Sequence, residues 1–296
     1  MGRELFESFE SARLVFGEVD EALKQKLSKL MFEGPESELT LTENAQPALM
    51  TVSLAVFRVL EREGGAELAT KAAFVAGHSL GEYSALAAAG TFTLADAAKL
   101  LKSRGRAMQK AVPVGQGAMA ALLGADVEKA TDIAKRAANG DVCAVANDNA
   151  PGQVVVSGDK AAVERAAKLA SDEGLRAMML PVSAPFHCSL MKPAADAMAD
   201  ALSKVMLEAP VVPLIANVTA SPVSDPLAIR NLLVEQVTSR VRWRECVLAM
   251  QERGVDRLIE VGVGKVLTGL TRRIARELGA VSVHTPADVE AFLKTL

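Results

Sequence analysis

Hydrophobic residues recur along this chain in two alternating spacings. The short apolar run at 72–76 predicts a buried parallel strand, and the apolar positions three or four residues apart that follow it predict a helix at 80–89. Strands that alternate with helices are typical of an α/β fold with a mainly parallel sheet. The same reasoning predicts further helices at 49–60, 92–110, 193–205, 228–237 and 243–253, and strands at 213–216 and 257–261.

From about residue 114 the order of the predicted elements changes to β-α-β-β-α-β, the ferredoxin-like pattern. We therefore expect a small ferredoxin-like domain at 114–182, inserted into a large catalytic α/β domain made of 1–113 and 183–296. A polar turn at 147–152 is expected between its two middle strands. The predicted strands are 118–123, 142–146, 153–156 and 176–182, and the predicted helices are 127–138 and 161–173.

Composition narrows the possible functions. Half of the 296 residues are hydrophobic, which supplies enough apolar surface to fold and excludes a disordered protein. The net charge of -3 and the aromatic content of 4% argue against the basic and stacking surfaces of nucleic-acid-binding proteins. The sequence has no run of 18 apolar residues, so it predicts no membrane span. The N-terminus does not have the pattern of a signal peptide. We expect a protein of the cytoplasm.

The cysteines support the same compartment and argue against a metal site. Cys143, Cys188 and Cys246 are odd in number, widely spaced and without a Cys-x-x-Cys pair. We expect neither a bound metal nor a disulfide framework.

Gly77-His78-Ser79-Leu80-Gly81 matches the G-x-S-x-G pattern between a predicted strand and a predicted helix. In an α/β-hydrolase-like fold this turn presents the serine to substrate, and the Leu80 N–H at the helix start helps to stabilise an oxyanion. Ser79 is therefore the candidate nucleophile. The alternative is an ordinary strand-to-helix turn in which Ser79 only caps the helix.

A nucleophilic serine needs a base, and the chain has three histidines. His78 adjoins Ser79 and should point away from it, while His284 lies near the C-terminus. His187 follows the predicted small domain, where a cleft between domains would place it, so elimination favours His187 as the base. A buried structural role for His187 remains the alternative. No acid has an obvious third role, so a backbone carbonyl is expected to orient the base.

Several motifs in order over nearly the whole chain resemble the malonyl-CoA:acyl carrier protein transacylase family. One such motif would be weak, but their number and order make the resemblance specific. The motifs are Gln46-Pro47-Ala48-Leu49, Gly77-His78-Ser79-Leu80-Gly81-Glu82-Tyr83, Arg104-Gly105, Gly117-Ala118-Met119-Ala120, Asn149-Ala150-Pro151-Gly152-Gln153-Val154-Val155, Ser183-Ala184-Pro185-Phe186-His187 and Glu260-Val261-Gly262-Val263-Gly264-Lys265-Val266-Leu267.

The resemblance implies a ping-pong transfer of malonyl from malonyl-CoA to the pantetheine thiol of an acyl carrier protein. Ser79 would carry the malonyl ester, and His187 would be the base, held by the main-chain carbonyl of Gln236. Arg104 would bind the malonyl carboxylate, although without the resemblance it would be taken for a solvated helix residue. The further residues implied on the substrate side are Phe186, whose bulk would exclude a branched acyl group, His78 and Asn149.

The chain departs from the family pattern at its start. Family members usually begin with a hydrophobic strand and a Gly-Gln-Gly-Ser-Gln loop before a segment like Met1–Phe6. That loop would supply a second oxyanion donor, and the strand would cover an edge of the sheet. Gly115-Gln116-Gly117 aligns with the entry to the small domain and is expected to be a linker turn. We expect the working enzyme to carry the upstream segment.

The expected partners are malonyl-CoA and an acyl carrier protein, with no cofactor, no nucleic acid, no membrane and a monomeric enzyme. A serine esterase or thioesterase, and an inactive carrier-binding variant, are the alternatives. Basic residues could meet CoA phosphates or an acidic carrier, or form solvated helix faces. They are Arg240, Arg242, Arg244, Lys265, Arg272 and Arg273.

Overall fold

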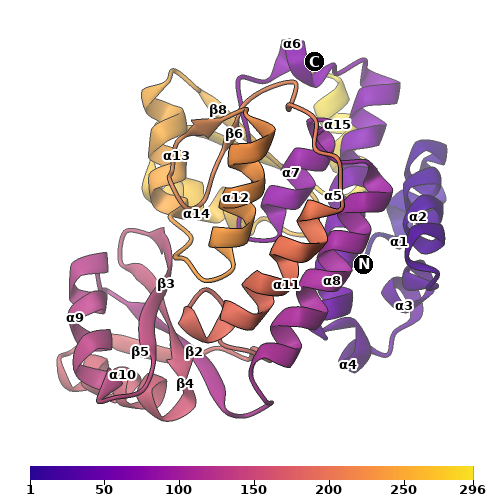
Figure 1. The fold of residues 1–296 in the computed structure, drawn as a ribbon. Coiled ribbons are helices and arrows are strands. Elements are labelled where there is room, and N and C mark those ends of the chain that lie inside the picture. The colour runs from indigo at the N-terminus through magenta and orange to yellow at the C-terminus, as the bar shows by residue number, and fades with distance from the viewer. Residues whose placement is uncertain (296) are drawn as a thin grey trace.

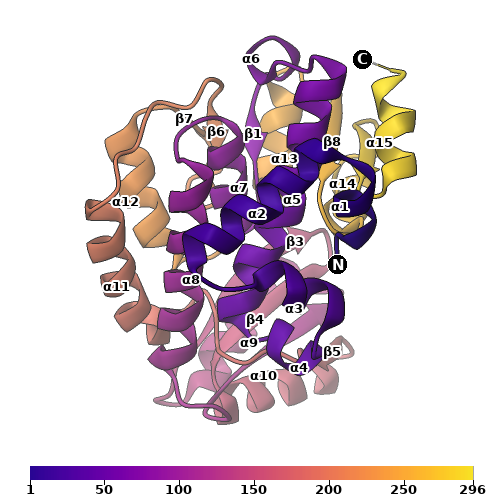
Figure 2. The ribbon, with the colours of Figure 1, turned by 90° about the vertical axis from the view of Figure 1, so that its right-hand side faces the viewer.

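A computed structural model describes residues 1–295, and Figure 1 shows it as helices grouped around short strands with a smaller β-rich lobe at one side. The N-terminal segment is helical, which the sequence analysis did not predict. The helices α1–α4 lie on the outside of the long helix α5 (Figure 2). Their bounds are α1 Arg3–Ser8, α2 Glu10–Leu23, α3 Leu27–Glu33, α4 Glu36–Leu39 and α5 Thr42–Gly64.

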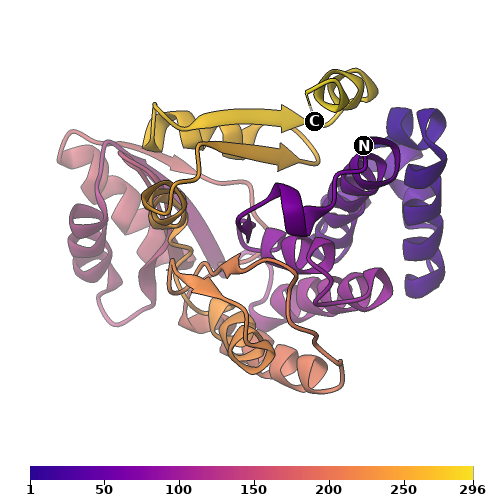
Figure 3. The ribbon, with the colours of Figure 1, turned by 90° about the horizontal axis from the view of Figure 1, so that it is seen from above.

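The strands of the large region form two separate short sheets. Strand β1 (Val75–Ala76) pairs in parallel with β6 (Leu214–Ile215), which pairs with β7 (Pro222–Val223). Strands β8 (Arg257–Val261) and β9 (Gly279–Val283) form a second parallel pair, which lies apart from the first in the view from above (Figure 3). Within residues 1–295, β1 and β8 each have a strand on one side only. The single mainly parallel sheet expected from the sequence is thus divided here.

The region after residue 116 has the predicted β-α-β-β-α-β order. Its strands form one antiparallel sheet in the order β3-β4-β2-β5, with Leu122 opposite Val154 in its register. Two helices pack on this sheet. The bounds are β2 Gly117–Leu123, α9 Val127–Ala138, β3 Cys143–Ala150, β4 Gln153–Asp159, α10 Lys160–Asp172 and β5 Arg176–Met179.

The prediction of a polar turn at 147–152 is wrong in its bounds. Strand β3 continues to Ala150, and only Pro151 and Gly152 form the turn. Polar residues enter the strand here because they pair beyond their own sheet. The Asp148 N–H donates to the Val241 carbonyl at 2.9 Å, and the Val241 N–H donates to the Ala146 carbonyl at 2.9 Å. Strand β3 therefore joins the small region to the large one, with irregular pairing to β4 where it leaves its own sheet.

The remaining helices surround the two short sheets. Side-chain caps fix several helix starts: the Asp225 carboxylate accepts from the Ala228 N–H, and Thr285 with Asp288 forms a capping box. Their bounds are α6 Leu68–Lys71, α7 Gly81–Ala88, α8 Leu94–Ala111, α11 Lys192–Ser203, α12 Pro226–Gln236, α13 Trp243–Glu252, α14 Val266–Ile274 and α15 Pro286–Leu293.

The buried apolar side chains form distinct clusters, one for each part of the fold. The main cluster lies where α2, α5, α7, α8 and α11 pack together, and another fills the small region beneath α9 and α10. Phe186 touches the main cluster and also a cluster on the other face of the small sheet. No helix of the described chain is long and apolar enough to cross a membrane.

Candidate active site

The turn between β1 and α7 is tight and strained, and it carries Ser79. Ser79 has a φ of 52°, a left-handed conformation that a side chain with a Cβ rarely adopts. A Cβ added to Gly77 would lie 2.0 Å from the Gly81 carbonyl carbon, so only glycine fits there. The sequence pattern therefore produces a sharp corner with Ser79 at its tip.

Ser79 and His187 are brought together from positions 108 residues apart. The Ser79 Oγ lies 2.8 Å from the His187 Nε2, and the His187 Nδ1 lies 2.9 Å from the main-chain oxygen of Gln236. His187 itself has a φ of 58°. Because a carbonyl can only accept, it favours the tautomer with the proton on Nδ1, which leaves Nε2 free to accept the serine proton.

His187 is nearly fully buried, and this sets its charge. Burial, followed by the positive charge of Arg104, lowers the pKa of His187 to about 3. The imidazole is thus neutral at physiological pH and ready to accept a proton. His78 is half-buried, and desolvation lowers its pKa as well.

The Arg104 guanidinium lies on the other side of the Ser79 hydroxyl and is only 1% exposed. Its Nη2 donates to the Ser79 Oγ at 3.0 Å and to the Gln236 side-chain oxygen at 2.9 Å, while Nη1 donates to Gln46 at 2.8 Å. The guanidinium also lies over the Tyr83 ring, 5.7 Å from its centre. Its Nε has no hydrogen-bond partner among the described residues.

Two residues that the sequence analysis did not assign to the site hold the serine turn from behind. The Asn217 side chain accepts from the Ser79 N–H at 2.8 Å and donates to the Gly77 carbonyl at 2.8 Å. The Asn217 N–H in turn donates to Glu82 at 2.7 Å. Glu82 had a signal in the sequence, since it lies three residues after Ser79 on the helix that the motif opens. Asn217 had none beyond following a predicted strand.

The other predicted site residues lie around the same turn. The Leu80 N–H, at the start of α7, has no backbone acceptor among residues 1–295. The His78 Nε2 points away from Ser79 to the Asn149 side chain, 2.8 Å from its oxygen, and its ring packs near Trp243. Phe186, beside His187, contributes a half-buried ring between the two regions.

Several candidates lie outside this arrangement. His284 pairs with Asp288, 2.9 Å away, at the end of β9. The basic residues considered for phosphates or an acidic partner are partly engaged: Arg242 binds Glu245, and Arg244 binds Asp148 with an N–O distance of 2.9 Å. These ion pairs reduce the free positive charge that a partner would meet.

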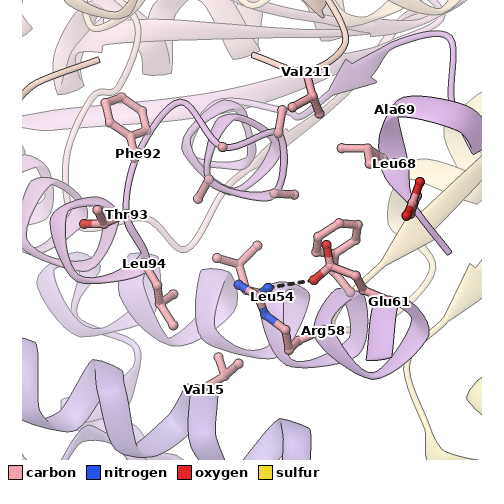
Figure 4. Close-up of a pocket in the computed structure, with 16 residues that line it drawn as sticks. Val15, Leu54, Arg58, Glu61, Leu68, Ala69, Phe92, Thr93, Leu94 and Val211 are labelled. Carbon is pink, nitrogen blue, oxygen red and sulfur yellow. Dashed lines mark hydrogen bonds and ion pairs between the residues drawn. The ribbon is translucent and has the colours of Figure 1, made fainter. Parts of the chain in front are cut away.

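A pocket of about 430 Å³ lies at the opposite end of α7 from Ser79 (Figure 4). Leu54 and Phe57 of α5, Phe92 and the end of α7 line it, and an Arg58–Glu61 ion pair of 2.6 Å lies along its α5 wall. None of the residues around the Ser79 hydroxyl belongs to its wall, so the chemistry lies elsewhere.

A strained serine, a neutral histidine base and a buried cation are the parts of an acyl-transfer site. Comparison with known proteins agrees: the family model described as "Acyl transferase domain" matches residues 1–288. The chain belongs to this acyl transferase family.

Individual members of this acyl transferase family resemble the chain closely. The malonyl CoA-acyl carrier protein transacylase of Bacillus subtilis is 44% identical over 298 residues, with 100% of this chain and 92% of the relative covered. A crystal structure of an acyl-carrier-protein-S-malonyltransferase from Bartonella henselae matches with a TM-score of 0.97 and 56% identity, over 100% of this chain and 94% of that one. A malonyl-transacylase in complex with its type II PKS acyl-carrier protein matches with a TM-score of 0.96 and 41% identity. The match covers 100% of this chain and 95% of that one.

Proposed function

We propose that this acyltransferase moves a malonyl group from malonyl-CoA to the phosphopantetheine thiol of an acyl carrier protein, as in fatty-acid synthesis. One observation carries the proposal: the Ser79 hydroxyl lies between the His187 Nε2 at 2.8 Å and the Arg104 Nη2 at 3.0 Å. A nucleophile, its base and a fixed cation thus meet at one oxygen. The names of the relatives support the same substrate pair.

In the first half-reaction the His187 Nε2 takes the Ser79 proton as the Oγ attacks the thioester carbonyl. The Leu80 N–H, at the start of α7, stabilises the oxyanion that forms. The intermediate then expels the CoA thiolate, which takes the proton from His187. The product is a malonyl ester on Ser79.

The second half-reaction runs the same steps with a different thiol. The carrier thiol gives its proton to His187 and attacks the ester carbonyl, and the Ser79 alkoxide leaves and recovers that proton. The Gln236 carbonyl keeps the imidazole oriented and stabilises it while it is positively charged. Because desolvation disfavours that charged form, His187 returns to neutral after each transfer.

Arg104 holds the malonyl carboxylate. A guanidinium can bind a carboxylate through two parallel hydrogen bonds, and a buried carboxylate without a partner would be costly. The unpartnered Nε and the Nη2 that now binds Ser79 support this role, because they are the donors that a substrate could engage. On the acyl side we assign substrate contacts to Phe186, His78 and Asn149.

The proposal extends to the organisation of the chain. We assign residues 114–182 to an inserted ferredoxin-like domain, and 1–113 with 183–296 to an α/β-hydrolase-like catalytic domain. The strand order β3-β4-β2-β5 and the separate apolar cluster of the small region support this division. We further propose a monomer that works in the cytoplasm without a cofactor, since the transfer uses only side chains and the two thiols.

Mixing the protein with malonyl-CoA and quenching it before peptide mass analysis tests the proposal. We expect a malonyl group on the Ser79 peptide and its loss when acyl carrier protein is added, with malonyl appearing on the carrier. Hydrolysis to free malonate at the same rate with and without carrier would instead indicate a thioesterase. Carrier binding without any adduct would indicate an inactive carrier-binding protein, and either result would overturn the transferase proposal.

A further inference from the structure

Glu82 is a buried acid close to the nucleophile that the proposed mechanism does not use. It lies on α7, one turn after Ser79, and is only 1% exposed. Figure 1 shows α7 between α12 and α5, in the middle of the large region. An acid at such a position is costly unless hydrogen bonds satisfy both of its oxygens.

Both carboxylate oxygens of Glu82 accept N–H groups of the active site. The Asn217 N–H donates to Oε1 at 2.7 Å, and the Gln236 side-chain amide donates to Oε2. Asn217 is the residue that holds both sides of the serine turn, and the main-chain carbonyl of Gln236 binds His187. Glu82 therefore connects the support of the nucleophile to the support of the base.

The Gln236 side chain also lies between two opposite charges. Its oxygen accepts from Arg104 at 2.9 Å, while its nitrogen donates to Glu82 and, at 3.0 Å, to the Ser79 carbonyl. A primary amide can serve both neighbours only in this orientation, which a cation on one side and a carboxylate on the other select. The orientation of Gln236 thus depends on the acid.

We propose that Glu82 is a positioning residue for the acyl transfer, an inference that rests on the proposed function. Its carboxylate holds Asn217 and Gln236, and through them it fixes the nucleophile and the base relative to each other. Its carboxylate oxygens bind Asn217 and Gln236, which carry the turn and the base. We therefore expect its removal to slow the acylation step and to change substrate binding little.

The carboxylate form is the one that accepts two N–H groups, so the effect should depend on pH. Burial raises the pKa of Glu82 to about 8, while Asn217, Gln236 and the charge of Arg104 act in the opposite direction. The carboxylate population of the wild type therefore grows as the pH rises through about 8. Cys246 and Tyr83, which interact electrostatically with Glu82, are neutral across this range because burial raises the pKa of each. His187, on the far side of Gln236, is also neutral because burial lowers its pKa.

The test compares the wild type with Glu82→Gln in rapid-quench measurements of Ser79 malonylation. We expect the first-order acylation rate at saturating malonyl-CoA to fall about 10- to 100-fold at pH 9, where wild-type Glu82 is a carboxylate, as for the loss of a hydrogen bond to a buried charged group. The amplitude of the burst, which counts folded sites, should stay the same, and KM should change less than about threefold. The deficit should grow between pH 7 and pH 9.

A merely structural role would give a smaller burst or a lower melting temperature with an unchanged rate constant. A rate constant within twofold of the wild type at both pH values would overturn the inference. If Glu82→Gln does not fold, Glu82→Asp keeps the charge but shortens the reach: a slower step at full amplitude supports the inference, and a wild-type rate contradicts it. Glu173→Gln, which removes an acid of the small region that binds Lys129 and Arg136, serves as the matched control.

These outcomes separate the two proposals. No adduct on Ser79 of the wild type would refute the transferase function itself. An adduct on the wild type that forms equally fast in Glu82→Gln would refute only the role of Glu82.

Discussion

The surroundings of Ser79 and the outer face of helix α9 in the small region use polar residues in opposite ways. Around Ser79 the polar side chains are buried and bonded to one another: Arg104, Asn217 and Gln236 are each 1% exposed or less. On α9 in the small region, charged side chains form ion pairs at the surface, such as Arg136 with Asp132 and Glu173. The same chemical groups therefore have different consequences in the two places.

The low dielectric around the buried groups and the access of water to the surface groups explain the difference. In the buried network each group has lost its water, so removing one partner leaves another donor or acceptor unsatisfied at full cost. In the small region water replaces a lost partner, and the apolar cluster beneath α9 and α10 stabilises the fold. We therefore expect large functional effects from the first network and small effects from the second.

Ser79→Ala should have the largest effect, because it removes the nucleophilic oxygen at the centre of the buried network. Without the Oγ no ester can form, so malonyl transfer should fall by at least about 10⁴-fold. Mass analysis after malonyl-CoA treatment should show no adduct on the peptide. The matched control is Ser84→Ala on the same helix, because the Ser84 hydroxyl is buried and has no hydrogen-bond partner within residues 1–295. A malonyl adduct on another residue of the Ser79→Ala protein, formed at the wild-type rate, would contradict the assignment.

Asn217→Ala should have the next largest effect, because the residue is fully buried. It would leave the Ser79 N–H and the Gly77 carbonyl without partners. We expect the free energy of unfolding to fall by about 2–4 kcal/mol and acylation to slow about 100-fold. Urea unfolding and rapid quench measure the two quantities. Asn231→Ala, on the exposed side of α12, should leave both quantities unchanged. Equal behaviour of the two variants would contradict the greater importance of the buried polar residues.

The sequence predicted the site best where local geometry carries the chemistry. A G-x-S-x-G pattern after an apolar run requires a tight corner, so Ser79 was found from the residues alone. His187 followed because few histidines were available. The roles of Arg104 and Gln236 were predicted only from the family resemblance, since a lone arginine on a helix is usually interpreted as a solvent-exposed residue. The contacts among these four side chains and backbones agree with the prediction, while their catalytic roles stay predictions for the experiments above.

The sequence did not predict features that depend on distant partners. Asn217 lies in an uncharged, proline-rich stretch, and only the fold brings it behind Ser79. The extension of β3 to Ala150 was missed for the same reason, because its polar residues pair with Val241 across the region boundary. The α1–α4 segment was not predicted either. Periodicity reports which face of an element is apolar, and it does not report what that face or its polar residues will meet.

The dependence of stability on pH tests the burial of neutral His187, and the expected effect is smaller. The pKa of His187 is lowered to about 3, so between about pH 3 and 6.5 the unfolded chain binds a proton that the folded protein does not. Stability from this residue is therefore lost as the pH falls, by about 2 kcal/mol between pH 7.5 and 5. Burial raises the pKa of Glu82, which acts in the opposite direction.

The His187→Gln variant isolates the contribution of this histidine, because Glu82 and the surface acids are common to both proteins. Urea unfolding at pH 7.5 and pH 5 should show a difference between the two proteins that changes by about 2 kcal/mol. The wild type should lose more stability, or gain less, on acidification than the variant. An unchanged difference would mean that His187 is not buried in its neutral form.

Glu173→Gln should have the smallest effect and tests the exposed side of the comparison. Glu173 binds Lys129 and also Arg136, the latter with an N–O distance of 2.5 Å, and these hydrogen bonds lower the pKa of its carboxyl. Because all three side chains are accessible to water, the variant should melt within experimental error of the wild type in 0.15 M salt, with unchanged malonyl transfer. A loss of stability as large as that of Asn217→Ala would show that the surface ion pairs, rather than the apolar cluster, hold the small region together.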